Sequence, residues 1–275
     1  MDFTLKRYEE LLTTLKGGGF VFLTFREFTE GTAEKIVVLR HDVDLVPENA
    51  LITAMIEHSL GIKGTYYFRI VPESFDENVI KNIYDLGHEV GYHYENMDAV
   101  ARKLKCNLRG SFNGFALEDH FDAAWEDFKL NLKKIRRIAP VNTIAMHGSP
   151  RSCFNNLDLW KYYDYRQLGI IGEPYMDVDF SDVFYLTDTG RRWNGSSVSV
   201  RDRVKSGINA KHLQFNSTRD IIDAARLGVL PSRIMINLHP QRWTNSFIPW
   251  AKELVWQNVK NIVKSYMISR NCRKR

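Results

Sequence analysis

Short apolar runs alternate along this chain with stretches of helical periodicity, and no other feature limits the possible folds as strongly. Seven apolar runs are predicted to form strands, at residues 36–40, 65–70, 89–93, 142–147, 168–173, 183–187 and 233–239. Helices are predicted at residues 2–16, 48–60, 76–86, 116–137, 155–167, 217–228 and 247–267. Because strands separated by helices indicate parallel βαβ units, the pattern predicts a single-domain α/β fold, a distorted (β/α)7 barrel similar to a TIM barrel.

The two ends of the chain complete this predicted barrel. Residues 1–35 are predicted to form an N-terminal helix and lead-in, and residues 36–275 the barrel with its C-terminal helix. Ser217 and Asp220 have the spacing of a capping box at the start of the helix before the last strand. The final helical pattern predicts a closing amphipathic helix with the apolar residues Trp250, Leu254, Val255, Val259 and Ile262.

Composition excludes several classes of protein. With 44% hydrophobic and 26% charged residues, the chain is neither disordered nor fibrous. Its three cysteines include no Cys-x-x-Cys pair for zinc or thiol chemistry. Charges interrupt the first residues, and no apolar run reaches the roughly 20 residues of a membrane span, so we expect a cytoplasmic protein without membrane insertion. The net charge of +5 is modest for a chain of this size, and the sequence has no zinc-finger or RNA-binding motif. We therefore expect no nucleic-acid partner.

Four of the eight histidines lie at or just beyond the ends of predicted strands: His41, His93, His147 and His239. In parallel barrels the chemistry occurs at the carboxyl ends of the strands. A random distribution would place fewer histidines there, so this clustering indicates a functional site. The oligomeric state is not predicted by any feature of the sequence.

Strand alternation sorts the side chains of the first strand into two faces. Arg40, Asp42 and Asp44 share one face, whereas His41 shares the other with Leu39 and Val43 and is expected to have a packing role. Two carboxylates and three imidazoles at one barrel mouth are suited to a mononuclear metal site, which commonly has three protein ligands and an open position for water. A second carboxylate and a further imidazole could then act as general base and general acid.

Three segments resemble motifs of the polysaccharide deacetylase family, the NodB-homology carbohydrate esterases. LRHDVD at 39–44 looks like the first motif, GHEVGYH at 87–93 is similar to the stretch leading into the second, and INLHP at 236–240 looks like the last. The resemblance implies a metal-dependent hydrolase that removes N- or O-acetyl groups from sugars on a distorted seven-stranded barrel. It also implies a catalytic-base Asp and a metal-binding Asp in the first motif, metal-binding histidines in the second and a catalytic-acid His in the last.

The sequence departs from this family pattern at three places. Met97 stands where the second motif has another histidine, and MHGSPR at 146–151 occupies the region of the family's Arg-x-Pro-x-Gly. The first motif has Asp-Val-Asp in place of adjacent aspartates. We therefore expect His147, at the end of its strand, to replace the missing histidine.

The resulting ligand set is Asp44, His93 and His147 around a divalent metal, most readily zinc, with Glu95 and Asp98 as the competing third ligands. Asp42 is then the expected base and His239 the expected acid. Sequence order does not orient Asp42 and Asp44 relative to each other, so their roles could be exchanged. Arg40 or Arg69, whichever reaches Asp42, is expected to hold its carboxylate in the charged form.

Further residues are expected at the rim of the site, where loops of a barrel commonly bind substrate: Arg151, Asp188, Trp193 and Trp243. Turn formation by Trp193 and packing of Trp243 under the C-terminal helix are equally compatible with the pattern. The predicted substrate is a carbohydrate or a sugar on a carrier, of the kind used as a surface-glycan precursor. A hydrolase of a non-carbohydrate amide, or a catalytically silent carbohydrate-binding relative, are the alternatives.

Overall fold

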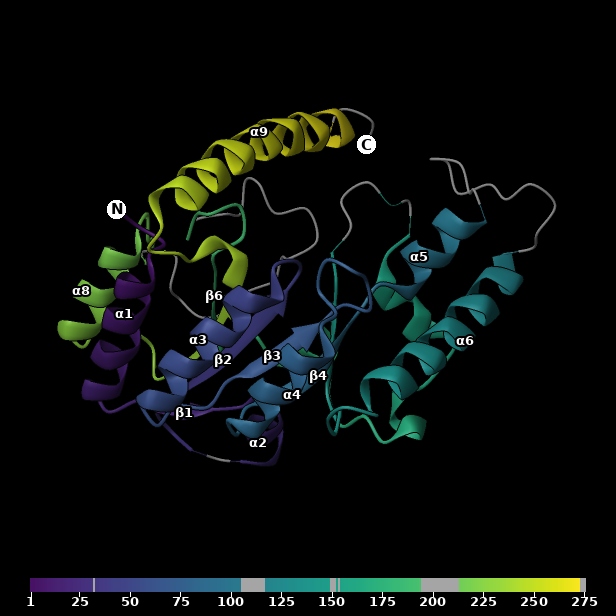
Figure 1. Ribbon diagram of the computed structural model, residues 1–275, viewed down its shortest axis with the longest axis horizontal. Coiled ribbons are helices and arrows are strands. Elements are labelled where there is room, and N and C mark those ends of the chain that lie inside the picture. The colour runs from purple at the N-terminus through teal and green to yellow at the C-terminus, as the bar shows by residue number, and fades with distance from the viewer. Residues whose placement is uncertain (32, 105–116, 149–151, 153, 194–212, 273–275) are drawn as a thin grey trace.

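One parallel sheet organises the chain (Figure 1). The computed structural model describes all residues except 32, 105–116, 149–151, 153, 194–212 and 273–275. The sheet has seven strands, with β1 paired to β2 beside the path β5-β4-β3-β2-β7-β6. The strands are β1 (Val21–Leu23), β2 (Ile36–Val43), β3 (Thr65–Phe68), β4 (Glu89–Tyr94), β5 (Ile144–Met146), β6 (Phe184–Thr187) and β7 (Arg233–Leu238).

Every strand pair in this sheet is parallel, so the predicted α/β class is confirmed. All eight residues of β2 are buried, because this strand lies at the centre between β7 on one side and β1 and β3 on the other. The sheet curls as a barrel does, and within the described residues no pairing joins β5 to β6. The expected distorted barrel is therefore open between these two strands.

Two predictions about the strands are wrong. Residues 168–173 do not form a strand: Gly169 has φ of 71°, and only an isolated bridge joins Thr143 to Gly172. The sequence analysis also missed β1, because three residues are too few to show an alternating pattern.

Helices cover the faces of the sheet, with α1 against α8 at one side and α5 against α6 at the other (Figure 1). The helices are α1 (Leu5–Gly17), α2 (Phe25–Glu30), α3 (Pro47–Ser59), α4 (Glu77–Asp85), α5 (Asn96–Lys103), α6 (Leu117–Ile135), α7 (Pro174–Asp177), α8 (Thr218–Arg226) and α9 (Phe247–Cys272). Short 3-10 helices are η1 (Asn156–Lys161), η2 (Tyr165–Leu168) and η4 (Pro240–Arg242). The capping box of Ser217 and Asp220 at α8 is confirmed.

The prediction of one helix over 155–167 is wrong, because two 3-10 helices occupy that region. Asn155 caps the first and Asp164 caps the second with its side chain, so the chain turns twice instead of continuing one helix. Helices α2, α5 and α7 were not predicted. All three are shorter than three turns, which gives hydrophobic periodicity little length in which to appear.

His41 has the packing role that strand alternation predicts. It is fully buried on the face of β2 opposite Asp42, where its ring stacks on Tyr66 with centroids 4.0 Å apart. Its Nε2 lies 3.0 Å from the Tyr8 hydroxyl and 3.0 Å from Glu57 Oε1. His41 therefore helps to join α1 and α3 to the central strand.

A row of aligned residues connects the sheet to the polar end of β2. Gly91 of β4 is paired with Tyr67 of β3, and Tyr67 is paired with Asp42. A Cβ atom at Gly91 would overlap the Tyr67 ring, so only glycine lets that ring lie across β4. The Tyr67 ring in turn lies 5.6 Å from the Arg40 guanidinium carbon, and its hydroxyl donates to Thr143 Oγ1 at 3.2 Å.

The overlap predicts that Gly91→Ala destabilises the fold by about 1–3 kcal/mol, since the buried Tyr67 ring must shift. Urea denaturation followed by circular dichroism measures this change. Gly17→Ala is the matched control, because a Cβ there meets no atom within 4 Å and the backbone is not left-handed. Equal stability of the Gly91→Ala variant and the wild type would show that the ring moves freely.

Candidate active site

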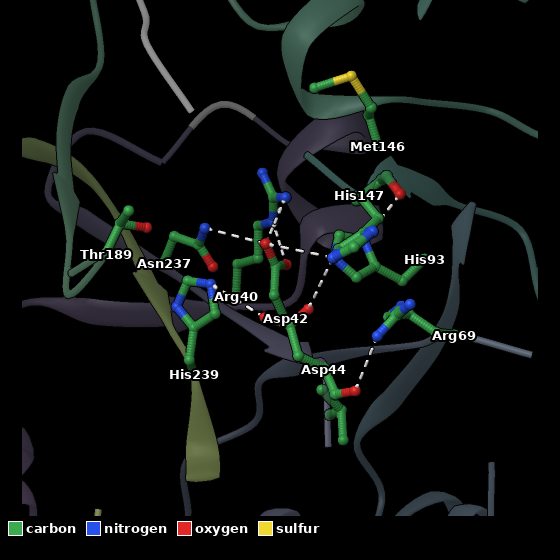
Figure 2. Close-up of polar contacts among 12 residues, drawn as sticks. Arg40, Asp42, Asp44, Arg69, His93, Met146, His147, Thr189, Asn237 and His239 are labelled. Atoms are coloured by element: carbon green, nitrogen blue, oxygen red, sulfur yellow. Dashed lines mark hydrogen bonds and ion pairs between the residues drawn. The ribbon is translucent and has the colours of Figure 1, made fainter. Parts of the chain in front are cut away.

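A buried ion pair fixes the first carboxylate of the site. Arg40 Nε donates to Asp42 Oδ1 at 2.8 Å, and Arg40 Nη2 donates to Asp42 Oδ2 at 2.9 Å. Asn237 Nδ2, from β7, donates to Asp42 Oδ2 at 3.1 Å (Figure 2). The two-pronged pairing with Arg40 leaves the Asp42 carboxylate one orientation, which is the geometry that makes Arg–carboxylate pairs strong.

The charge of Asp42 is maintained by its neighbours. Burial by itself raises the pKa of this carboxyl, but Arg40 and the imidazoles of His93 and His239 outweigh burial and hold the pKa below its usual range. Asp42 is therefore ionised at neutral pH and can accept a proton. The sequence analysis left Arg40 and Arg69 as alternatives for this partner, and the structure places Arg40 there.

Asp44, directly after β2, is the centre of the cluster (Figure 2). Its Oδ1 lies 3.6 Å from His93 Nε2 and 3.6 Å from His147 Nε2, and its Oδ2 lies 3.9 Å from His239 Nε2. Oδ1 is buried and has no hydrogen-bond partner among the residues that the structure describes. Burial alone raises the pKa of Asp44, yet the imidazoles hold that pKa well below its usual range, so the carboxylate carries a charge among three rings.

Both histidines beside Asp44 Oδ1 turn the same ring nitrogen toward it. His93 Nδ1 donates to the carbonyl of Ala145 at 2.9 Å, and His147 Nδ1 pairs with Glu95 Oε2 at 3.1 Å. A carbonyl or carboxylate oxygen accepts a hydrogen bond from Nδ1–H, so Nε2 is the nitrogen that each ring presents to Asp44. Histidines that bind metals are oriented in this way.

Glu95 and Asp98, the alternative third ligands, have other partners. Arg69 Nη2 donates to both oxygens of Glu95, at 2.8 and 3.0 Å, and Arg69 Nη1 donates to the carbonyl of Asp44 at 3.1 Å. Asp98 accepts from Arg102 Nη1 at 2.9 Å. Glu95 therefore contacts the cluster through His147, while Asp98 forms its ion pair with Arg102.

The donors around Asp44 Oδ1 fit a divalent cation in kind and nearly in spacing. Two imidazole nitrogens and one carboxylate oxygen are common zinc ligands, and bonds of about 2.0–2.1 Å in a tetrahedral site separate ligand atoms by about 3.3 Å. Here the two measured separations from Asp44 Oδ1 are 3.6 Å. As the side chains stand, no three His, Cys, Asp or Glu in the described residues meet the requirements of a formed metal site. The cluster would have to contract slightly around an ion.

His239 is oriented by a second carboxylate, Asp188. His239 Nδ1 lies 2.6 Å from Asp188 Oδ1, and the backbone N–H of His239 donates to Asp188 Oδ2 at 3.0 Å. Trp243 Nε1 donates to Asp188 Oδ2 at 2.8 Å, and Arg242 Nη1 donates to Asp188 Oδ1. Burial by itself raises the pKa of Asp188, but Arg242 and His239 outweigh burial and hold the pKa below its usual range. The carboxylate therefore stays charged beside the imidazole.

The rim residues expected from sequence are distributed differently. Trp193 and Trp243 are buried, at 5% and 1% exposure, and pack against Phe3, so neither presents an open ring face to a substrate. Phe3, which precedes α1, and Tyr8 of α1, which contacts Trp243, are apolar neighbours that sequence spacing does not reveal. Asp188 acts on His239 instead of lying at the rim. Arg151 lies outside the described residues.

Three residues at the site were not assigned a role from sequence. Asn237 of β7 donates to Asp42, a bond that the sequence did not predict. Glu173, at the start of α7, accepts backbone N–H groups of Met146, Tyr175 and Met176, and Tyr175 places its ring 5.0 Å from the Arg40 guanidinium carbon. Burial raises the pKa of Glu173 to about 7, although Arg40 opposes the shift. The sequence signal that could have identified Glu173 is its position directly before Pro174, where an acidic residue can cap a helix.

A cavity of about 270 Å³ opens beside Asp44 and His147. Gln241 and Arg242 line it from the segment after β7, and α9 supplies the opposite wall with Glu253, Trp256, Gln257 and Lys260. The site is therefore reached from the side on which α9 lies.

Comparison with known proteins gives a likeness to solved structures only: no family model and no curated protein matches the chain. Streptococcus pyogenes deacetylase PplD in complex with acetate is 17% identical, with a TM-score of 0.40, and the match covers 56% of this chain and 66% of that one. A CE4 family pseudoenzyme from Bacillus anthracis is 14% identical, with a TM-score of 0.42, over 89% of this chain and 63% of that one.

The Xyl-CE4 domain of a multidomain xylanase from the hindgut metagenome of Trinervitermes trinervoides is 12% identical, with a TM-score of 0.40 and coverage of 87% and 84%. The chain spans slightly less than two thirds of the first two proteins. These proteins are of the kind that the sequence motifs resemble, and the likeness concerns the fold. They include both a deacetylase and a pseudoenzyme.

The ion pair of Glu95 with Arg69 predicts a loss of stability in acid. Burial raises the pKa of Glu95, but the bonds from His147 and Arg69 lower it from 4.5 to about 2. The folded chain then binds fewer protons than the unfolded chain, so this stabilisation is complete above about pH 4.5 and is lost as the pH falls toward 2. The stability difference between wild type and Glu95→Gln should shrink by about 2 kcal/mol from about pH 6 to pH 3.

Urea denaturation over that pH series measures the difference. Glu126→Gln is the control, because Glu126 also pairs with a cation, Lys129, at 2.7 Å but is 65% exposed. Its difference from wild type should stay near zero at every pH. A Glu95→Gln difference that does not vary with pH would contradict the assigned ion pair.

Proposed function

We propose that this chain is a metal-dependent hydrolase that removes acetyl groups from an acetylated sugar, acting on a glycan precursor. The observation that carries the proposal is the placement of Asp42 and His239 in one cluster with Asp44: Asp44 Oδ2 lies 3.9 Å from His239 Nε2, and His93 Nε2 lies 3.7 Å from Asp42 Oδ2. Asp42 is a carboxylate held ionised by Arg40, and His239 is an imidazole held by Asp188. The motif resemblance at residues 39–44, 87–93 and 236–240 supports the same reaction.

A divalent cation, with zinc as the first candidate, would be held by Asp44, His93 and His147. When bound, such a cation polarises the acetyl carbonyl and lowers the pKa of a neighbouring water. The two Nε2 atoms and Asp44 Oδ1 are the groups available to hold it. Glu95 would orient His147 by accepting a hydrogen bond from its Nδ1–H.

Asp42 would serve as the general base. It accepts a proton from the attacking water while the water oxygen bonds to the acetyl carbon. Arg40 keeps the carboxylate in place and charged, and Asn237 fixes the same oxygen from β7. Because these donors are already in position, the carboxylate needs no rearrangement when the water reacts.

His239 would serve as the general acid. Its Nδ1 is occupied by Asp188, so Nε2 is the nitrogen that gives a proton to the departing sugar nitrogen or oxygen. The bond between the acetyl carbon and that atom breaks, and acetate and the free sugar group are released. The ionised Asp188 stabilises the imidazolium form of His239 that this step requires.

Acetate release is the direct test. Protein reconstituted with zinc is incubated with N-acetylated mono- and oligosaccharides, sugar nucleotides, O-acetylated sugars and non-sugar acetamides, and acetate is measured enzymatically. Asp42→Asn should lower kcat by about 10²–10⁴-fold while the metal content is unchanged, because the base is lost and the ligands remain. Asp98→Asn is the matched control, a buried carboxylate paired with Arg102 whose loss should leave turnover unchanged.

Each other result rejects part of the proposal. Turnover of the non-sugar acetamides alone would indicate a hydrolase of a different amide. Absence of both turnover and bound metal would indicate a silent carbohydrate-binding protein. Unchanged turnover by Asp42→Asn would exclude Asp42 as the base.

The ligand set has its own test, by titration of the purified protein with zinc and elemental analysis. His147→Asn should weaken zinc binding by at least about 100-fold, because one of three ligands is lost. Asp98→Asn should bind as the wild type does. The reverse result, with affinity lost in Asp98→Asn and kept in His147→Asn, would assign the third position to Asp98.

A further inference from the structure

The C-terminal helix α9 is turned with its polar side toward the protein. Gln257 and Asn261 are buried, each at 3% exposure, and Gln257 Nε2 donates to Asn261 Oδ1 at 2.9 Å. Asn261 Nδ2 donates to the carbonyl of Gly190 at 2.8 Å, which ties the helix to the loop after β6. A helix at a protein surface ordinarily buries its apolar face, so α9 has the opposite arrangement.

The position of α9 explains its polar inner side. Figure 1 shows it as the long yellow helix that runs along one border of the molecule, away from the helices on the faces of the sheet. Its residues Glu253, Gln257 and Lys260 line the cavity that reaches Asp44 and His147. An apolar face would be poorly matched to this polar opening, so the inner side of the helix is polar.

The outer side of α9 is consequently an exposed apolar stripe. Ile248, Val255, Val259 and Ile262 are exposed to 79%, 64%, 48% and 71%. Their spacings of seven, four and three residues place them along one line of the helix. The helix is amphipathic as the sequence predicts, but Trp250 and Leu254, which the sequence analysis grouped with three of these residues, are partly buried. Exposed apolar stripes of this kind mark contact surfaces for membranes or proteins.

Charge distinguishes between these two classes of partner. Residues 247–275 contain seven lysines and arginines and one glutamate, a formal charge of +6, whereas the other residues have 31 basic and 32 acidic groups, a charge of −1. The entire net positive charge of the protein thus belongs to the segment that carries the stripe. Two copies meeting through α9 would bring like charges together, whereas an anionic surface is complementary to them.

We propose that α9 lies flat on an anionic lipid bilayer, with its apolar stripe in the interface and with the net positive charge of residues 247–275 drawing it to the surface. Amphipathic helices with an apolar face, lysines and an interfacial tryptophan bind membranes in this way. Trp256 is 57% exposed next to the stripe, and Lys260 Nζ lies 5.4 Å from the centre of its ring. Among the helices that the structure describes, none has both the length and the hydropathy of a membrane span.

Co-sedimentation of the full chain with vesicles tests this proposal without any assay of catalysis, so it can fail or succeed independently of the deacetylase function. Vesicles contain either phosphatidylcholine alone or phosphatidylcholine with 30% phosphatidylglycerol. We expect binding to the anionic vesicles only, with affinity falling steeply as salt is raised. The double variant Val255→Gln/Ile262→Gln should bind at least about tenfold more weakly, because it loses two inserted side chains.

Leu130→Gln is the matched control, since Leu130 is an apolar residue on helix α6 that is 67% exposed but lies outside the stripe. It should bind vesicles as the wild type does. Equal binding of the wild type to neutral and anionic vesicles, or none to either, would overturn the proposal. Light scattering that finds a dimer in solution, separated by the Val255→Gln/Ile262→Gln change, would assign the stripe to a second copy instead.

Discussion

The buried pair of Arg40 and Asp42 is the interaction on which the site depends. Arg40 is completely inaccessible to solvent, and burying a guanidinium costs free energy unless its charge is matched closely. Asp42 supplies the matching charge with two hydrogen bonds, and the rings of Tyr67 and Tyr175 face the cation. Loss of either member would leave the other charge uncompensated in the interior, a cost of about 3–5 kcal/mol. The fold and the placement of the base are therefore stabilised by the same contact.

This pair also explains features of the sheet that are distant from the reaction. The Tyr67 ring can approach Arg40 because Gly91 on the next strand has no side chain. Asn237 reaches Asp42 because β7 is paired with β2 in a register that aligns Asn237 with Arg40. One glycine, one strand register and one aromatic ring thus fix the direction of a single carboxylate.

Strand alternation was sufficient to predict which groups of β2 share a face, because a period of two follows from backbone geometry alone. It placed Arg40 with Asp42 and Asp44, and it correctly separated His41 from them. It could not distinguish Arg40 from Arg69 as the partner of Asp42, since that choice depends on the reach of two flexible side chains. Likewise, the sequence offered Glu95 and Asp98 as competing ligands but did not show that Arg69 binds Glu95 or that Arg102 binds Asp98.

The same limit applies to the aromatic residues and to α9. The sequence around a loop tryptophan does not distinguish a ring that lines a pocket from one that, like Trp243, donates to a buried carboxylate. Hydrophobic periodicity predicted correctly that α9 is amphipathic, but it grouped the partly buried Trp250 and Leu254 with the exposed stripe. Orientation depends on what the helix covers, and the polar cavity beside Asp44 was not visible in the spacing of residues on α9 itself.

The three imidazoles at the mouth of the sheet are all oriented by a hydrogen bond at Nδ1, each with a different partner. Each is held through Nδ1, His93 by a neutral carbonyl and His147 and His239 by carboxylates, so each presents Nε2 to Asp44. Asp44 Oδ1 faces His93 and His147, while Oδ2 faces His239 and accepts a bond from Gln241. The two oxygens of one carboxylate thereby divide the imidazoles into a pair suited to hold an ion and a single ring free to transfer a proton. Because α9 forms a wall of the cavity beside this carboxylate, a surface that binds the outer stripe of α9 would also determine from which direction a substrate reaches the three rings.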